Sequence, residues 1–120
     1  MFELVFKALG EPTRLKIIKL LAHRELCVCD LEEILQMSQP RISQHLKVLK
    51  HAGLVNDWKE GQRTICSLNQ TALNNTINEF LQYIAKPIES IAEMAEEVAR
   101  IPAVTGEISC KETTPQNGSN

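Results

Sequence analysis

Apolar residues recur at three- and four-residue spacing over most of the first half of the chain, which is the spacing of amphipathic helices. This pattern predicts a short helix over Phe2–Leu9 and a second helix opened by Pro12. It also predicts a short helix over Asp30–Gln36 and a longer one that follows Ser38 and stops at Gly53. Two helices joined by so short a turn have the outline of a helix-turn-helix.

Two short runs of β-forming residues follow and predict strands over Leu54–Trp58 and Thr64–Leu68, joined through the Gly-containing turn Lys59–Arg63. Helical spacing then returns over Thr71–Ala85 and continues, after a proline, to Arg100. The expected fold is therefore mainly α with a small β-hairpin. It is a winged helix-turn-helix with four helices, a two-stranded wing and one or two C-terminal helices.

The longer helix of the helix-turn-helix carries three Lys or Arg residues and no acidic residue. Its Gln, Ser, Arg and Lys side chains can donate to base edges and phosphates, so we expect it to read DNA; a solvated helix face is the alternative. The turn of the wing adds two more cations. The predicted DNA-binding residues are Ser38, Gln39, Arg41, Ser43, Gln44, Lys47, Lys50, Lys59 and Arg63.

The composition fits one ordinary globular domain, with 120 residues, 43% hydrophobic and 23% charged. We assign this domain to residues 1–101 and expect residues 102–120, rich in Thr, Ser, Gly and Asn, to form a flexible C-terminal tail. No apolar run reaches membrane-spanning length, and no signal-peptide pattern opens the chain. We therefore expect a cytoplasmic protein with no membrane partner.

The charge is unevenly distributed along the chain. Residues 1–63 carry ten Lys or Arg against eight Asp or Glu, whereas the rest carries three against seven. The net charge of −2 argues against general affinity for nucleic acid, so the DNA-binding surface must be local. Binding to that surface should depend strongly on salt, because each phosphate contact releases counterions.

Cys27 and Cys29 form a CxC pair directly before the predicted third helix. In an extended segment both thiols point to one side, whereas in a helix they diverge by about 200°. Asp30 and Glu33 have the spacing of a capping box that would start the helix after the pair, but both conformations remain open. Thiolates are the preferred ligands of thiophilic ions such as As(III), Sb(III), Cd(II) and Pb(II), and two small buried residues are the alternative.

Several segments together resemble the ArsR/SmtB family of metal-responsive winged-helix repressors, and in particular its arsenic-sensing branch with the sequence CVC. They are Leu9–Leu15, Glu25–Leu31, Ser38–Pro40, Ser43–Leu46, Ala52–Val55 and Gly61–Arg63. The resemblance implies a homodimeric repressor that binds double-stranded operator DNA. It also implies release when As(III) or Sb(III) binds cysteine thiolates at the start of the third helix, and no cofactor for folding.

The chain departs from this branch at Glu32, where such arsenic sensors often carry a third cysteine. Cys110, in the predicted tail, is our candidate for a third ligand. Cys66 is a weaker candidate, because it shares a strand face with Leu68 and is expected in the core. The departure leaves Cd(II) or Pb(II) open as the inducer.

An apolar seam along the last helices predicts packing against another helix, either within the chain or across a dimer. The resemblance implies a homodimer whose interface also includes the first helix, so that residues 1–101 serve both DNA binding and dimerisation. The predicted interface residues are Phe2, Val5, Phe6, Ile77, Phe80, Ile84, Ile88 and Ile91.

Two other classes of function fit the cysteines less well. A thiol redox switch on the same scaffold would oxidise Cys27 and Cys29, or one of them with Cys110, but a disulfide at this separation is unfavourable. A thiol oxidoreductase would need a βαβ frame and a His or Asp partner near the cysteines, and the sequence provides neither. We therefore do not expect an enzyme.

Overall fold

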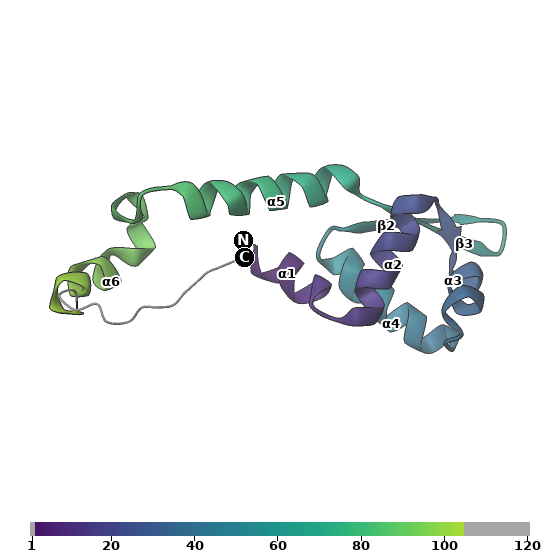
Figure 1. Ribbon diagram of the computed structural model, residues 1–120. Coiled ribbons are helices and arrows are strands. Elements are labelled where there is room, and N and C mark those ends of the chain that lie inside the picture. The colour runs from purple at the N-terminus through teal and green to yellow at the C-terminus, as the bar shows by residue number, and fades with distance from the viewer. Residues whose placement is uncertain (1, 105–120) are drawn as a thin grey trace. The chain divides into compact units, whose positions relative to one another are not determined.

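A computed structural model describes residues 2–104, which fall into two compact units, one up to Leu81 and one from Gln82 (Figure 1). The first unit contains four short helices and a three-stranded antiparallel sheet, and the start of a long helix. The helices are α1 (Glu3–Leu9), α2 (Pro12–His23), α3 (Val28–Leu35), α4 (Gln39–His51) and α5 (Gln70–Ala85). The winged helix-turn-helix predicted from the sequence is confirmed.

Short polar side chains fix the starts of these helices. The Glu11 carboxylate accepts from the Arg14 N–H at 2.9 Å and begins α2. Ser38 Oγ accepts from the Arg41 N–H at 3.4 Å and begins α4, as its position before Pro40 predicts. Side-chain caps of this kind satisfy backbone donors that have no partner inside the helix.

The start of α3 differs from the prediction. The helix begins at Val28, with Cys27 as its N-cap, and not at Asp30. Cys27 Sγ accepts from the Asp30 N–H at 3.1 Å, and the Asp30 carboxylate accepts from the Cys27 N–H at 2.9 Å. The capping box therefore joins Cys27 to Asp30, and the box predicted between Asp30 and Glu33 is wrong. A sulfur atom takes the place that Ser or Thr oxygen usually occupies.

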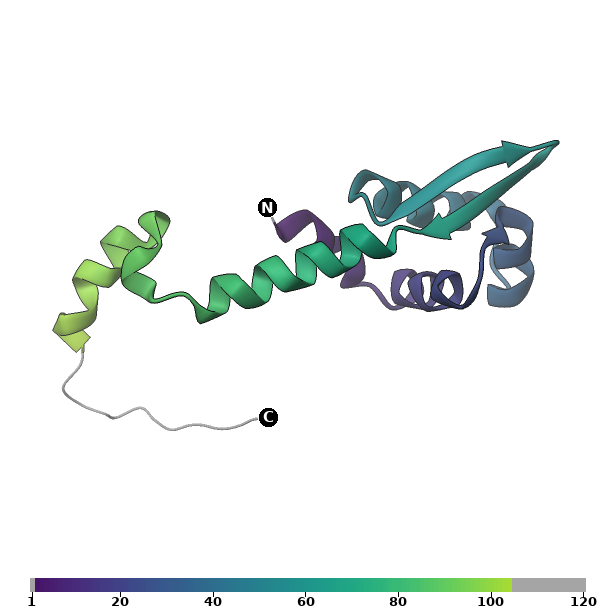
Figure 2. The same cartoon turned by 90° about the horizontal axis from the view of Figure 1, so that it is seen from above.

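The sheet has a strand that the sequence pattern did not predict. Its order is β1-β3-β2, with β1 (Leu26–Cys27) added to the hairpin of β2 (Val55–Glu60) and β3 (Arg63–Leu68). A two-residue strand is too short to show alternation. The hairpin turn is also tighter than predicted, because Lys59 and Arg63 are paired in the strands and Gly61 turns the chain with φ of 64°. Figure 2 shows this wing extending beyond the helices of the first unit.

The core of the first unit lies between the helices and the sheet. Its fully buried side chains include Ile17 of α2, Leu31 of α3, and Ile42 and Leu49 of α4. Arg14 ties α1 to this core, because its Nε donates to the Ala8 carbonyl at 2.6 Å and its Nη2 to the Lys7 carbonyl at 3.3 Å. The same guanidinium lies 3.4 Å from the Nδ1 atom of His45 on α4. Arg14 thus fastens the end of α1 beside α4.

The second unit does not contain the continuous helix that was predicted up to Arg100. The chain instead forms two single 3₁₀ turns, one α-helix and a further 3₁₀ turn: η1 (Ile88–Ser90), η2 (Ala92–Met94), α6 (Ala95–Arg100) and η3 (Ile101–Val104). Ile91 is extended between the first two turns and interrupts the helical hydrogen bonds. The predicted tail begins inside η3, and its residues 105–120 lie outside the described part. Among residues 2–104, no helix has both the length and the apolar character needed to cross a bilayer.

Candidate thiol site and nucleic-acid interface

Cys27 and Cys29 converge at the start of α3, where the structure joins their sulfur atoms in a disulfide. Cys27 is buried in β1, Cys29 is exposed in the first helical turn, and Asp30 beside them is half-buried. One ligand atom from each of these three residues lies within 4.8 Å of the others. Cys27 has extended backbone angles and Cys29 is helical, so the sulfurs escape the divergence expected if both residues were helical. The two alternatives for this segment are therefore both partly correct.

Asp30 connects this site to the wing. Besides accepting from the Cys27 N–H, its Oδ2 atom lies 3.9 Å from Nη2 of Arg63, the first residue of β3. Both side chains are partly exposed, so the pair alone contributes little to stability. Sequence reasoning treated Asp30 only as a helix start and missed this connection, which depends on the tertiary fold.

Cys66 belongs to the core, as the sequence indicates, because it is fully buried in β3 opposite Leu26 and Asp57. Burial, together with the nearby Asp57 carboxylate and against the opposing effect of Lys50, raises the pKa of this thiol to about 11. It is therefore protonated at neutral pH and a poor metal ligand. Among the described residues, the cluster of possible ligands contains Cys27, Cys29 and Asp30 without Cys66. Cys110 lies outside the described residues.

The residues predicted to bind DNA lie on α4 and the wing. All of them are exposed except Ser43, which is half-buried: Ser38, Gln39, Arg41, Gln44, Lys47, Lys50, Lys59 and Arg63. Five of the nine predicted side chains are engaged within the chain. Ser38 Oγ caps α4, and Arg63 lies 3.9 Å from Asp30. Gln39 Nε2 donates to Ser43 Oγ at 2.7 Å, and Lys50 Nζ lies 3.0 Å from the Asp57 carboxylate. Arg41, Gln44 and Lys47 on α4 and Lys59 on the wing remain the exposed groups best suited to contact a nucleic acid.

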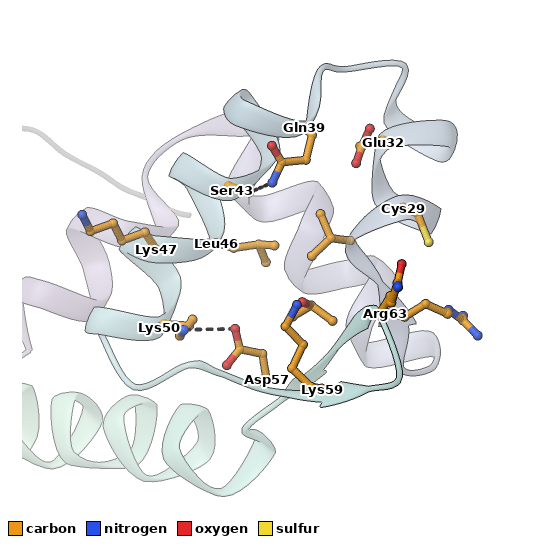
Figure 3. A pocket seen from close by; sticks show the side chains of 13 residues that line it. Cys29, Glu32, Gln39, Ser43, Leu46, Lys47, Lys50, Asp57, Lys59 and Arg63 are labelled. Carbon is orange, nitrogen blue, oxygen red and sulfur yellow. Dashed lines mark hydrogen bonds and ion pairs between the residues drawn. The ribbon is translucent and has the colours of Figure 1, made fainter.

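A hollow of about 780 Å³ lies between α3, α4 and the wing (Figure 3). Its lining joins the thiol site to the DNA-facing cations: Val28, Cys29, Glu32, Gln39, Ser43, Leu46, Lys47, Lys50, Asp57, Lys59, Gln62, Arg63 and Thr64. Cys29 and Arg63 lie on one side of this hollow, and the Lys50–Asp57 ion pair crosses another part of it. Cys29 and several of the cations predicted to bind DNA therefore line one surface.

Comparison of the sequence with known proteins shows to which family the chain belongs. Residues 11–57 match the family described as "Bacterial regulatory protein, arsR family". The "Transcriptional repressor SdpR" of Bacillus subtilis (strain 168) is 43% identical over 82 residues, which are 68% of this chain and 91% of that protein. The "Arsenical resistance operon repressor" of Staphylococcus xylosus is 40% identical over 87 residues, covering 72% of this chain and 76% of that one. The chain belongs to the ArsR family.

A solved structure supports the same fold for this ArsR-family chain. The "ArsR-like Transcriptional Regulator from Rhodococcus sp. RHA1" aligns with a TM-score of 0.63 and 27% identity, over 89% of this chain and 94% of that one. Members of the family are transcriptional regulators that bind DNA through the helix-turn-helix, and this chain is a repressor of that class and not an enzyme.

The residues predicted at a dimer interface divide into three groups in this ArsR-family chain. Phe2 and Phe6 each pack edge to face against Phe80, and the ring centroids of Phe6 and Phe80 are 4.9 Å apart. Val5 is buried in the chain's own core, so it has little surface left for a partner. Ile84 of α5 is 62% exposed, whereas Ile77, Ile88 and Ile91 are half-buried.

Proposed function

We propose that this ArsR-family repressor binds operator DNA as a homodimer and leaves it when As(III) or Sb(III) binds Cys27 and Cys29. The donor atoms of Cys27, Cys29 and Asp30 lie within 4.8 Å of one another, and thiolates suit thiophilic ions. Relatives of the chain include arsenical resistance operon repressors, which supports this class of inducer.

Binding requires the reduced pair of thiols. As arsenous acid condenses with the two cysteines, two As–S bonds form and two As–O bonds break. Each thiol proton leaves with a hydroxyl group as water, and arsenic remains in the +3 state. An exposed Cys29 allows the first bond, and Cys27 closes the chelate.

The observation that carries the proposal is the double role of Cys27 Sγ. This atom accepts the Asp30 N–H and begins α3, the first helix of the helix-turn-helix. Ligation fixes the position and geometry of the same sulfur atom, so we expect the hydrogen bond from the Asp30 N–H to weaken. Loss of an N-cap typically costs about 1 kcal/mol. The start of α3 must therefore rearrange when the site is occupied, and α4 follows after only three residues.

The proposal of a homodimer is based on the apolar surface of α1 and α5. The ring cluster of Phe2, Phe6 and Phe80 joins these helices, and α5 leaves Leu81 and Ile84 largely exposed. An unburied apolar stripe on a long helix favours packing against a second copy. Two copies place two recognition helices on one operator, as a two-fold symmetric site requires.

The decisive experiment titrates operator-bound, reduced protein separately with As(III), Sb(III), Cd(II), Pb(II), Zn(II) and peroxide, and follows release by fluorescence anisotropy. The variant Cys27→Ser keeps a good N-cap atom but removes a soft ligand, so it should bind the operator normally and no longer respond to As(III). Cys29→Ser should behave alike. Release by As(III) that persists in the double serine variant would refute the thiol site.

Cys110→Ser tests the third ligand in the same assay. A rise of about tenfold or more in the As(III) concentration needed for release would make Cys110 a ligand; an unchanged midpoint would mean that two thiolates suffice. A response to Cd(II) or Pb(II) with none to As(III) would assign the inducer to those ions.

A thiol redox switch is the second candidate, and the Cys27–Cys29 disulfide is the observation in its favour. In that reaction the two thiols lose two electrons and two protons to hydrogen peroxide, whose O–O bond breaks to give two molecules of water. Release by peroxide together with indifference to As(III) would select this function over the first.

A further inference from the structure

We propose that the thiol site controls operator binding through the wing, with Asp30 and Arg63 as the connecting residues. This inference rests on the proposed function and specifies how its signal reaches DNA. The alternative route passes from α3 to α4 and shifts the recognition helix. The two routes predict different behaviour for single cations on the wing and on α4.

The backbone of the thiol site is part of the sheet that forms the wing. Cys27 in β1 pairs with Ile65 in β3, and Ile65 pairs on its other side with Trp58 in β2. One row of backbone partners therefore runs from the sensing cysteine to the outer strand of the wing. Because β1 has only two residues, a small displacement of Cys27 is enough to detach it and leave β3 with an unpaired edge.

A polar connection runs parallel to this row. The Asp30 carboxylate accepts from the Cys27 N–H at 2.9 Å and lies 3.9 Å from the Arg63 guanidinium. When ligation shifts Cys27, the Cys27 N–H moves relative to this carboxylate, and Arg63 loses the partner that holds its side chain in one orientation. Asp30 acts here by positioning Arg63, since an exposed ion pair contributes little energy by itself.

The position of Arg63 makes this change relevant to DNA. Its side chain is 59% exposed and lines the same hollow as Lys47 and Lys59 (Figure 3). Within the described residues, the two side-chain hydrogen bonds at this site join Cys27 to Asp30, and the ion pair of Asp30 joins it to Arg63 of the wing. Lys50 of α4 is instead held by Asp57, which is part of the wing as well.

The test compares Arg63→Ala with the matched control Lys47→Ala, an exposed cation on α4. Operator Kd is measured with and without saturating As(III), with loading of the thiols followed by mass spectrometry under reducing conditions. In the wild type we expect As(III) to raise Kd about tenfold or more, a usual size for allosteric coupling. Both variants should bind the unloaded operator more weakly, because each loses a phosphate-binding charge.

The ratio of loaded to unloaded Kd separates the routes. For Arg63→Ala it should fall to about threefold or less, because the contact that As(III) would remove is already absent. For Lys47→Ala it should stay at the wild-type value. A full ratio in Arg63→Ala with a collapsed ratio in Lys47→Ala would overturn the wing route and assign the signal to α4.

Asp30→Asn provides a second variant that keeps the size of the side chain and an oxygen acceptor for the Cys27 N–H. It removes the charge that faces Arg63, so the Kd ratio, measured at As(III) concentrations that load the thiols fully, should fall. An unchanged ratio with normal loading would contradict the role of Asp30.

Trp58 is the single tryptophan of the chain and lies in the wing, which gives a readout without DNA. As(III) should shift its emission in the wild type and leave Cys29→Ser unchanged. Absence of As(III) loading in the wild type would refute the proposed function itself. Loading and operator release with constant Trp58 emission would refute only the wing route.

Discussion

Cys27 and Asp30 cap each other at the start of α3, with sulfur accepting one backbone N–H and carboxylate the other. Cys27 Sγ, a soft ligand atom, is thus also the N-cap acceptor of α3. A thiophilic ligand and the helix start would therefore share one sulfur atom. Under the proposed function, a ligand that moves this sulfur therefore acts directly on the start of α3.

The first prediction concerns the stability of this cap. Asp30→Ala should lower the free energy of unfolding by about 1–2 kcal/mol, because it removes the acceptor for the Cys27 N–H. The matched control is Glu33→Ala, the residue that the sequence pattern assigned to the box, which should change stability by less than about 0.5 kcal/mol. Urea unfolding with reductant present measures both. Equal losses in the two variants would show that the cap is not formed in solution.

The second prediction concerns the ion pair between Lys50 and Asp57, whose charged atoms lie 3.0 Å apart. Asp57→Asn should make Lys50 available to phosphate, so operator affinity should rise and the slope of log K against log salt should steepen by about one. Anisotropy titrations at several salt concentrations measure the slope.

The control for that variant is Glu60→Gln, which removes an exposed wing carboxylate bonded to the Trp58 N–H at 3.0 Å and not to a lysine. It changes the net charge equally but should leave the salt slope as in the wild type. The same steepening in both variants would mean that net charge alone acts.

The third prediction tests self-association through α5. Ile84→Glu places a charge on an exposed apolar position and should weaken the dimer by about tenfold or more, since a buried unpaired charge is costly. Gln82→Glu adds the same charge about 200° around the helix and should leave the dimer intact. Sedimentation equilibrium gives both constants. A monomeric wild type would refute the interface outright.

The fourth prediction follows from the raised pKa of Cys66, about 11 against an ordinary 9.0. The folded chain holds the thiol proton more tightly than the unfolded chain does. The stability contributed by the neutral thiol is therefore complete below pH 9.0 and is lost as the pH rises towards 11. Cys66→Ala should lack this component, so its stability should fall less steeply over that interval. The free energy of unfolding is measured in urea at each pH for both proteins. If it falls equally steeply with pH in the wild type and in Cys66→Ala, the raised pKa of Cys66 is contradicted.

The sequence predicts those parts of this fold in which local patterning and tertiary packing agree. The helix from Gln39 to His51 follows from its apolar stripe, its N-cap Ser38 and the glycine after it. The hairpin follows from two β-forming runs around Gly61. The CxC pair stands out because two soft ligands at that spacing have few purely structural explanations.

The parts that escape prediction depend on partners distant in sequence or on unusual chemistry. Strand β1 exists because Leu26 and Cys27 pair with Cys66 and Ile65, and two residues show no periodicity of their own. The cap at Cys27 uses sulfur, which is rare among N-caps. The break at Ile91 interrupts a run whose apolar spacing is helical throughout.

Arg14 contacts both α1 and α4, two helices with different proposed functions. Its guanidinium bonds the last carbonyls of α1, proposed for self-association, and lies 3.4 Å from His45 of α4, proposed for reading DNA. Two binding equilibria that depend on the same contacts are coupled, and the coupling is reciprocal. If operator binding stabilises the contacts of Arg14, it strengthens dimer formation by the same factor by which dimer formation strengthens operator binding. Under the proposed function, repression then depends on the concentration of the regulator as well as on the inducer, because dimers are scarcer when few copies of the chain are present.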